Sequence, residues 1–449
     1  MAVSPARSSP ARAVAFEILL RVEREGSYAS ELLHSAALAE LSTRDHRLAT
    51  ELVMGVLRWQ SLLDRRLAAA SSQKLDRLDA EVLAALRLGA CQLQFLSRVP
   101  ARAAIFESVE LVKTARKRSA ASFVNAVLRK ISQAGAEDVF AEIAESPDTI
   151  KLAQTAAHPP WLVARWAETY GLEAARRICV HGQTVPGTAI HIHDHQCEAE
   201  LAEAGVQLAP GCLLSAARRV LAGDVTGTRA YAEGRISIQD EASQLVALLA
   251  GRGKLILDCC AAPGSKTAML ARRNPSARVF ATELHPHRAR LLQSLTRLPN
   301  VRIVAADARH LPFLRAFDRI LADVPCSGTG TLARNPEIKW RLKPEDLCDL
   351  QSRQLAILKS ALGQLAMGGR LVYSTCSLER EENEAVVEAA LDGTTEFNLV
   401  ECKKELEQLR QAGELCWENT ASLLAGPYLR TIPGVLPCDG FFAAMIERR

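Results

Sequence analysis

The chain has 449 residues, which at roughly 150 residues per domain suggests about three domains. Hydrophobic residues make up 48% and charged residues 24%, a balance that excludes wholesale disorder, and no apolar run is long enough to span a membrane. The net charge of +4 is too small to indicate a nucleic-acid partner by itself.

The first part of the chain, residues 1–138, is predicted to be an all-helical domain. Apolar side chains recur at helical spacing within 14–22 and 48–57. A cluster of cations follows, made of Lys113, Arg116, Lys117 and Arg118. This cluster fits either a solvated helix end, where cations complement the helix dipole, or a phosphate-binding patch.

Residues 139–232 are predicted to form a small mixed α/β segment. A proline pair precedes a predicted helix at 161–170, and residues 188–193 alternate apolar and polar as a strand does. His191, His193 and His195 invite a metal hypothesis, but their spacing lacks one residue of the metallo-hydrolase pattern HxHxDH. A polar strand at an RNA-facing or solvent edge is favoured, and no metal is predicted.

Residues 233–449 alternate strand and helix, a pattern typical of a parallel, doubly wound sheet. Leucines at helical spacing between 347 and 365 predict a long helix that the pair Gly368-Gly369 ends. Ligands of such sheets bind beyond the carboxyl ends of the strands. The strands are predicted at 254–258, 278–283, 301–307, 319–323 and 370–374.

Small residues follow the first of these strands and let the backbone approach a ligand closely. A Lys-Thr pair ends the loop, but the glycines of a phosphate loop are missing. Glu283 can accept hydrogen bonds from ribose hydroxyls, and Asp307 can reach an adenine amine. Either acid alone fits a helix N-cap. Together with Asp258 at the end of the first strand and with the small-residue loop, they suit an adenosine without a long phosphate tail, as in S-adenosylmethionine. The predicted loop contacts are Cys260, Ala261, Ala262, Pro263, Gly264, Ser265 and Lys266.

Two of the 12 cysteines stand at predicted strand ends, Cys326 after Asp323 and Cys376 after the last strand. No CxxC spacing occurs, which argues against a disulfide scaffold or zinc ribbon and favours a reducing cytoplasm. Two thiols and an acid beside a methyl donor suit cytosine chemistry. A thiolate that adds to ring carbon 6 makes carbon 5 nucleophilic, and an acid near nitrogen 3 stabilises the developing charge. Spacing alone leaves open which thiol attacks.

Three motifs resemble those of RNA 5-methylcytosine methyltransferases of the Nol–Nop–Sun family: 260–264 (CAAPG), 323–330 (DVPCSGTG) and 374–377 (STCS). The helical region, with 55–58 (GVLR) and 123–129 (FVNAVLR), resembles the NusB-like RNA-binding domain. The combination is similar to the bacterial RsmB branch, which methylates a cytosine of small-subunit ribosomal RNA.

The resemblance implies three parts: a NusB-like domain (1–138), a small α/β RNA-binding or linker segment (139–232) and a Rossmann-like methyltransferase domain (233–449). It implies that Cys376 is the nucleophile and Cys326 the cysteine that assists release. It implies that Asp323 contacts both the target cytosine and the methionine end of the cofactor. S-adenosylmethionine is the implied cofactor, ribosomal RNA the implied partner, and we expect a cytoplasmic monomer.

Three departures from the family pattern bear on this reading. Ser265 stands where the family loop usually has a second glycine, and a positive φ there would cost about 1 kcal/mol. His191 and His193 replace the usual Arg and Asn, so RNA contacts from that strand stay open. Glu283 stands where aspartate is more common.

Two alternatives remain from the sequence. The same chemistry could act on transfer RNA, although the helical domain disfavours it. The helical domain could also indicate a non-catalytic RNA-binding factor, but the presence of both thiols with Asp323 argues against an inactive enzyme.

Overall fold

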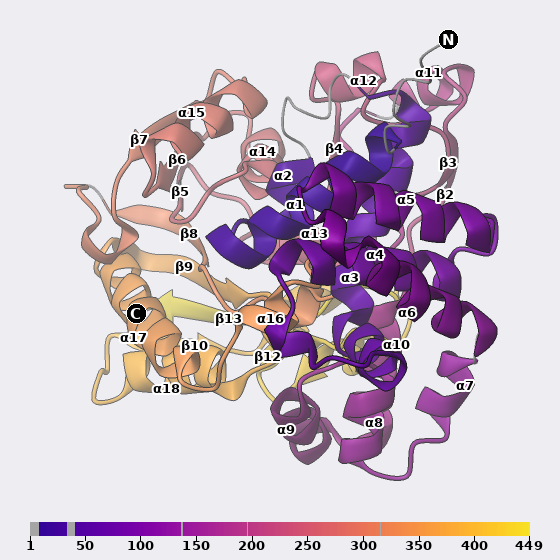
Figure 1. Cartoon of the computed structure of the whole chain (residues 1–449). Coiled ribbons are helices and arrows are strands. Elements are labelled where there is room, and N and C mark those ends of the chain that lie inside the picture. The colour runs from indigo at the N-terminus through magenta and orange to yellow at the C-terminus, as the bar shows by residue number, and fades with distance from the viewer. Residues whose placement is uncertain (1–8, 34–40, 136–137, 195, 315) are drawn as a thin grey trace. The chain divides into compact units, whose positions relative to one another are not determined.

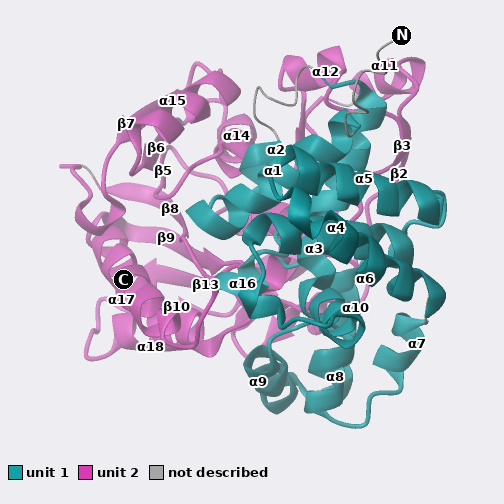
Figure 2. Ribbon diagram, viewed as in Figure 1, with its two compact units in different colours: residues 1–184, 332–341 teal, residues 185–331, 342–449 magenta. Residues whose placement is uncertain are grey.

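A computed structural model describes residues 9–33, 41–135, 138–194, 196–314 and 316–449 (Figure 1). The chain forms two compact units (Figure 2). Unit 1 comprises residues 1–184 and 332–341, and unit 2 comprises residues 185–331 and 342–449. No helix among the described residues is long and apolar enough to cross a membrane.

Unit 1 is helical, as predicted for the first part of the chain. Ser42 caps its longest helix by accepting a hydrogen bond from the Asp45 amide at 3.1 Å. The helices are α1 (Pro10–Glu25), α2 (Ala29–Leu33), α3 (Thr43–Ala70), α4 (Ala80–Phe95), α5 (Ala101–Thr114), α6 (Ala121–Gln133), α7 (Val139–Ala144), α8 (Thr149–Thr155), α9 (Pro160–Tyr170), α10 (Leu172–Gln183) and α16 (Ile338–Arg341).

The cation cluster lies at and just beyond the end of α5. Lys113 pairs with Glu110 at 2.7 Å, and Lys117 pairs with Asp79 at 2.9 Å. These exposed pairs are what a solvated helix end provides.

Unit 2 begins with a small antiparallel sheet in the order β2-β3-β1-β4. The predicted strand near residue 190 is confirmed as β1 (Thr188–Ile192), which buries Ile190 and Ile192 in a small core. His195 lies outside the described residues. The other elements are β2 (Gln207–Pro210), β3 (Ala217–Ala222), β4 (Ile236–Ile238), α11 (Cys197–Glu203) and α12 (Arg229–Ala232).

Among the residues that the structure describes, the large sheet of unit 2 has nine strands, and the five predicted strands form its parallel part. Their order is β7-β6-β5-β8-β9, so the direction of winding switches between β5 and β8. The bounds are β5 (Leu255–Asp258), β6 (Arg278–Glu283), β7 (Val301–Ala305), β8 (Phe317–Asp323) and β9 (Leu365–Thr375).

The sheet is mixed rather than wholly parallel, which corrects the sequence prediction. The apolar strand β13 pairs antiparallel with β9 and carries β12 and β10 beside it. Because hairpin connections need no crossover helix, strand–helix alternation could not indicate these strands. They are β10 (Phe397–Val400), β11 (Leu424–Ala425), β12 (Tyr428–Thr431) and β13 (Phe441–Arg448).

Helices that cover the large sheet bury its aliphatic side chains in two clusters. The predicted end of the long helix at Gly368-Gly369 is wrong: that helix ends at Gly363, and both glycines lie inside β9. Leu365 is fully buried and pairs with Phe317, so the chain enters the sheet at once. The helices are α13 (Glu241–Leu249), α14 (Ser265–Arg273), α15 (Pro286–Leu295), α17 (Asp346–Gly363), α18 (Glu384–Leu391) and α19 (Cys402–Gln411).

Candidate active site

The two predicted cysteines lie together beyond the carboxyl ends of neighbouring strands. β8 and β9 run parallel, with Asp323 opposite Ser374, and each chain then turns into a loop that carries one cysteine. The sulfur atoms of Cys326 and Cys376 lie 3.2 Å apart. The Cys376 amide also donates to the Cys326 sulfur at 3.3 Å.

The environment of Cys326 favours its neutral thiol. The hydrogen bond with Cys376 and burial together raise the pKa of Cys326 well above its ordinary value. A protonated Cys326 can donate a hydrogen bond to a thiolate on Cys376 or give its proton to a reaction product.

An ion pair stands beside the thiols. Lys266 Nζ lies 2.7 Å from Asp323 Oδ2, and the Ser374 hydroxyl donates to Asp323 Oδ1 at 2.8 Å. Burial lowers the pKa of Lys266, but the Asp323 carboxylate more than offsets this and raises it overall. The ammonium group also interacts electrostatically with Cys376 and lies 5.3 Å from the centre of the Phe441 ring.

The predicted cofactor loop connects β5 to α14. Gly264 has φ of 119°, and a Cβ atom there would lie 2.4 Å from Thr296 Oγ1, so glycine is needed for both reasons. The Ala262–Pro263 peptide bond is cis. Ser265 is the first residue of α14 and is not among the residues with positive φ, so this departure from the family pattern costs no backbone strain.

Asp258 ends β5 and is buried beneath the loop. It accepts a hydrogen bond from the Thr267 hydroxyl at 2.7 Å, and its other carboxylate oxygen has no hydrogen-bond partner among the described residues. Burial raises the pKa of Asp258 to about 6. The acid that ends the first strand therefore supports the loop from below.

The two acids predicted to hold adenosine lie at adjacent strand ends. Glu283 ends β6, is buried, and accepts from the His285 amide at 3.1 Å. Asp307 lies two residues beyond β7, which ends at Ala305 rather than at residue 307 as predicted. Asp307 caps a short 3₁₀ turn and pairs with Arg309 at 2.6 Å, which lowers the pKa of its carboxyl group.

The loop and these acids fit an adenosine cofactor. The Ala261 amide donates to the Thr282 carbonyl at 2.9 Å, so the small-residue loop packs onto the end of β6, where Glu283 stands. Small side chains leave room for a ligand there, and the Glu283 carboxylate can still accept hydrogen bonds. The predicted set is thus brought together, with Asp307 at its outer edge.

A buried carboxylate that the sequence did not single out holds both cysteine loops. Glu382 is fully buried and accepts from the Ser327 amide at 2.7 Å and from Gln354 Nε2 at 2.8 Å. It also accepts hydrogen bonds from the hydroxyl groups of Ser327 and Ser377, the residues next to the two thiols. Glu382 lies within an acidic run, 379–384, in which Glu379 is buried as well, and the run itself does not indicate which acid holds the two loops.

The backbone of the Cys326 loop also approaches a second chain segment closely. The Gly330 amide donates to the Cys376 carbonyl at 2.9 Å, and the Gly440 amide donates to the Gly330 carbonyl at 2.8 Å. A Cβ atom on Gly330 would lie 2.3 Å from the Gly440 carbonyl oxygen, so only glycine fits. The two cysteine loops are therefore bonded backbone to backbone.

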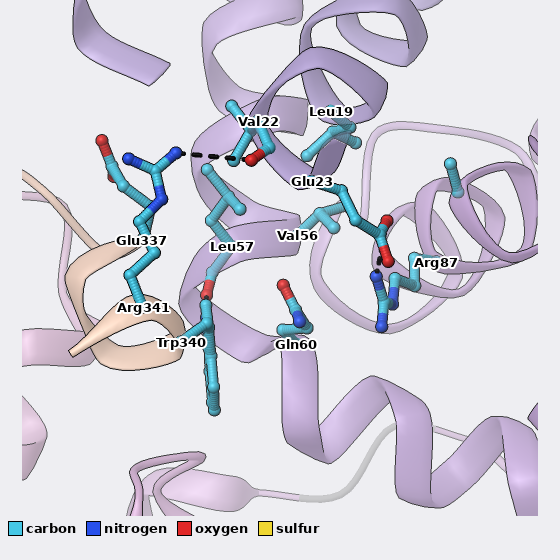
Figure 3. A pocket seen from close by; sticks show the side chains of 11 residues that line it. Leu19, Val22, Glu23, Val56, Leu57, Gln60, Arg87, Glu337, Trp340 and Arg341 are labelled. Carbon is cyan, nitrogen blue, oxygen red and sulfur yellow. Dashed lines mark hydrogen bonds and ion pairs between the residues drawn. The ribbon is translucent and has the colours of Figure 1, made fainter. Parts of the chain in front are cut away.

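Immediately after this loop, residues 332–341 become part of unit 1. Lys339 is buried and donates to the carbonyls of Arg58 at 2.7 Å and Ala157 at 3.0 Å, and Trp340 Nε1 donates to the Leu57 carbonyl at 2.6 Å. A cavity of about 260 Å³ lies beside Trp340, between this segment and helices α1, α3 and α4 (Figure 3). This segment is thus anchored in the helical unit.

Family models match two parts of the chain. The model described as 16S rRNA methyltransferase RsmB/F matches residues 246–447, and that of the NusB family matches residues 9–133. The probable ribosomal RNA small subunit methyltransferase B of Bacillus subtilis is 34% identical over 99% of this chain and 100% of its own length. The ribosomal RNA small subunit methyltransferase B of Vibrio cholerae is 33% identical, with 98% and 97% covered.

Solved structures agree with the fold. The protein PH0851 covers 98% of this chain with a TM-score of 0.79 at 21% identity, over 99% of its own length. A methyltransferase homologue from Pyrococcus horikoshii matches 68% of this chain and 99% of its own, with a TM-score of 0.55 at 26% identity. The predicted fold class, a NusB-like helical domain joined to a Rossmann-like methyltransferase domain, is confirmed.

Proposed function

This chain belongs to the 16S rRNA methyltransferase RsmB/F family, and we propose that it methylates carbon 5 of one cytosine in small-subunit ribosomal RNA. The observation that carries the cytosine assignment is the pair of thiols 3.2 Å apart beside the Lys266–Asp323 ion pair. A methyltransferase whose acceptor is already nucleophilic has no need of a cysteine nucleophile, still less of two.

We assign the cofactor to the carboxyl ends of β5, β6 and β7. S-adenosylmethionine supplies an electrophilic methyl group on its sulfonium. Residues 260–266 would face it, with Glu283 at the ribose, Asp307 at the adenine and Asp323 at the methionine end. The support for this placement is the φ of 119° at Gly264 and the packing of the loop onto β6.

We assign the nucleophile to Cys376. Its thiolate forms a bond to carbon 6 of the flipped-out cytosine, and the electron pair of the 5,6 double bond then becomes available at carbon 5. The neighbouring Lys266 ammonium favours the negative sulfur. Asp323, oriented by Lys266 and Ser374, would stand at nitrogen 3, where charge develops as the thiolate adds.

We assign product release to Cys326. After methyl transfer, a base removes the proton from carbon 5, the 5,6 double bond forms again, and the bond from Cys376 to carbon 6 breaks. A neutral Cys326 beside Cys376 can donate a hydrogen bond to the departing thiolate, and the raised pKa of Cys326 keeps its proton available.

We propose that the NusB-like domain and the small antiparallel sheet recognise RNA by shape and phosphate contacts. Their division at residues 138 and 232 remains a proposal. The match of residues 9–133 to the NusB family supports an RNA-binding role for the helical domain.

A methyl-transfer assay tests this proposal. Full-length protein would meet radiolabelled S-adenosylmethionine with unmodified small-subunit ribosomal RNA, and with bulk transfer RNA in parallel, before nucleoside analysis. We expect label in 5-methylcytidine from ribosomal RNA. Label only from transfer RNA would overturn the substrate, and no label even on the assembled subunit would favour a non-catalytic RNA-binding factor.

A further inference from the structure

A second hollow in unit 2 lies away from the thiols and is lined by cations. Its volume is about 420 Å³, and its walls come from β1, the segment 214–216, and helices α13 and α14. Met269 and Leu248 form part of an apolar floor. We call it the basic crevice, after the charged and titratable residues that line it: His191, His193, Arg252, Arg272, Arg273 and Glu414.

The arginines of the basic crevice outnumber its carboxylates. Arg273 pairs with Glu414, the one acid in the lining, with Nη2 and Oε1 2.9 Å apart. Arg252 donates to the Arg273 carbonyl at 2.7 Å, and Arg272 donates to the Gly234 carbonyl at 2.7 Å. Carbonyl contacts hold these two guanidinium groups in position, and neither forms an ion pair within 4.0 Å among the described residues. Asp194 contributes a longer-range attraction to Arg272.

Two histidines line the basic crevice beside these arginines. Gln244 donates to the Gln239 carbonyl, so its amide oxygen faces His191 Nδ1 at 2.8 Å, and that nitrogen carries a proton. The His193 ring centre lies 4.7 Å from that of His191. Burial, then His191 and Arg272, lower the pKa of His193 to about 3. Three arginines against one carboxylate in the lining make the basic crevice a site that favours an anion.

We propose that the basic crevice binds a backbone phosphate of the RNA substrate, close to the nucleotide whose base enters the active site. This inference rests on the proposed function. Arginine matches phosphate because its planar fork can donate two parallel hydrogen bonds to the oxygens. At 1.5 Å per residue, α14 carries the chain about 9 Å along its axis from Lys266 to Arg272. One helix therefore connects the active site to the crevice over a distance that a flanking nucleotide can span.

The test is the salt dependence of RNA binding by the full-length protein. In the double variant Arg252→Gln, Arg272→Gln, we expect the affinity for unmodified small-subunit ribosomal RNA to fall about tenfold at low salt. The slope of log Kd against log salt should decrease by about 1, the change for one lost phosphate contact. The matched control is Arg380→Gln, because Arg380 is exposed and pairs with Glu388 at 3.0 Å.

Each outcome has a distinct meaning. Unchanged affinity and slope in a double variant that melts like the wild type would overturn the basic crevice while leaving the proposed methylation intact. Binding of inorganic phosphate in the basic crevice, with an unchanged slope of log Kd against log salt for RNA, would make the crevice a site for free phosphate. That result would also overturn the inference. Absence of RNA binding by the wild-type protein would instead contradict the proposed function.

Discussion

Asp258 and Asp323 end neighbouring strands of the parallel sheet but differ in their partners. Asp323 faces Lys266 at 2.7 Å, whereas buried Asp258 has the Thr267 hydroxyl at 2.7 Å. A carboxylate that loses hydration without gaining a close cation resists ionisation, which is why the pKa of Asp258 rises to about 6. The same residue type thus gives an ion-paired group beside the thiols and a support beneath the cofactor loop whose raised pKa keeps it protonated in mildly acidic solution.

This difference predicts a pH dependence of stability. The folded chain holds the Asp258 proton up to about pH 6 and the unfolded chain loses it near 3.8, so stability should fall as pH rises between these values. Two pKa units correspond to about 3 kcal/mol. Asp258→Asn, which mimics the protonated acid, should flatten that part of the curve of unfolding free energy against pH. If the wild type and the variant lost unfolding free energy equally between these pH values, the proposed titration of Asp258 would be wrong.

Glu382 predicts a positioning effect. Glu382→Gln removes the charge that four donors share and turns an amide group toward some of them, so we expect a loss of about 2–4 kcal/mol in stability. The loops that carry the thiols should loosen, and covalent adduct formation should slow at least tenfold while cofactor affinity stays near normal. Stopped-flow kinetics measures the rate of adduct formation, and calorimetry measures the stability and the cofactor affinity. Glu388→Gln is the control, because Glu388 is exposed, and equal adduct rates in both variants would exclude the role.

The sequence predicts the reactive residues at the ends of the strands, but it does not predict the buried residue that holds their loops in place. Cys326, Cys376 and Asp323 follow recognisable strand runs, and the structure brings them together with Lys266. Glu382 could not be distinguished from its acidic neighbours, because its burial depends on a helix and two loops that meet only in the folded chain.

Among the elements, the short helix α16 has an unusual composition for its burial. Lys339 is 1% exposed, and burial lowers its pKa well below the ordinary value, with the Arg58 charge acting in the same direction. Its amine donates hydrogen bonds to two backbone carbonyls of unit 1. Polar contacts therefore hold this helix, from Lys339 and also from the Trp340 indole and the Arg341 guanidinium group.

Lys339→Ala should accordingly destabilise unit 1. The loss of a long buried side chain and of two hydrogen bonds should cost about 2–4 kcal/mol. Hydrogen exchange should accelerate at the α3 amides near residue 58, and the melting temperature should fall. Lys343→Ala, at an exposed position four residues on, should change neither. If the two variants behaved alike, the anchoring of α16 by Lys339 would be wrong.

Most of the parallel sheet can be predicted because β5, β6, β8 and β9 each end an apolar run in a polar residue, whereas β7 ends at Ala305. The antiparallel strands were not predicted, because β13 is apolar along most of its length and lacks the alternation that marks a half-exposed strand. Glycine often ends helices, which is why the pair Gly368-Gly369 predicts a helix end, but here Gly368, with φ of 69°, lies within β9 where its register with β8 shifts.

At the scale of the whole molecule, the chain order of the family motifs is preserved, yet the chain does not divide into consecutive blocks. Residues 332–341 belong to the compact helical unit although the sequence on both sides belongs to the other. Sequence patterns cannot reveal such an excursion, because it depends on contacts between segments about 280 residues apart. The boundaries predicted at 138 and 232 differ from those of the two compact units, so they stay a prediction about which residues share a function.

Trapping of the covalent complex is the most direct test of the proposed cysteine mechanism. Full-length Cys326→Ala and Cys376→Ala would each meet the RNA substrate and S-adenosylmethionine, and denaturing gels would reveal protein bound to RNA. We predict that Cys326→Ala accumulates the adduct, because Cys376 attacks but release fails, and that Cys376→Ala forms none while binding the cofactor normally. An adduct in Cys376→Ala and none in Cys326→Ala would reverse the roles, and methylation of cytosine by a variant that lacks both thiols would contradict the covalent mechanism.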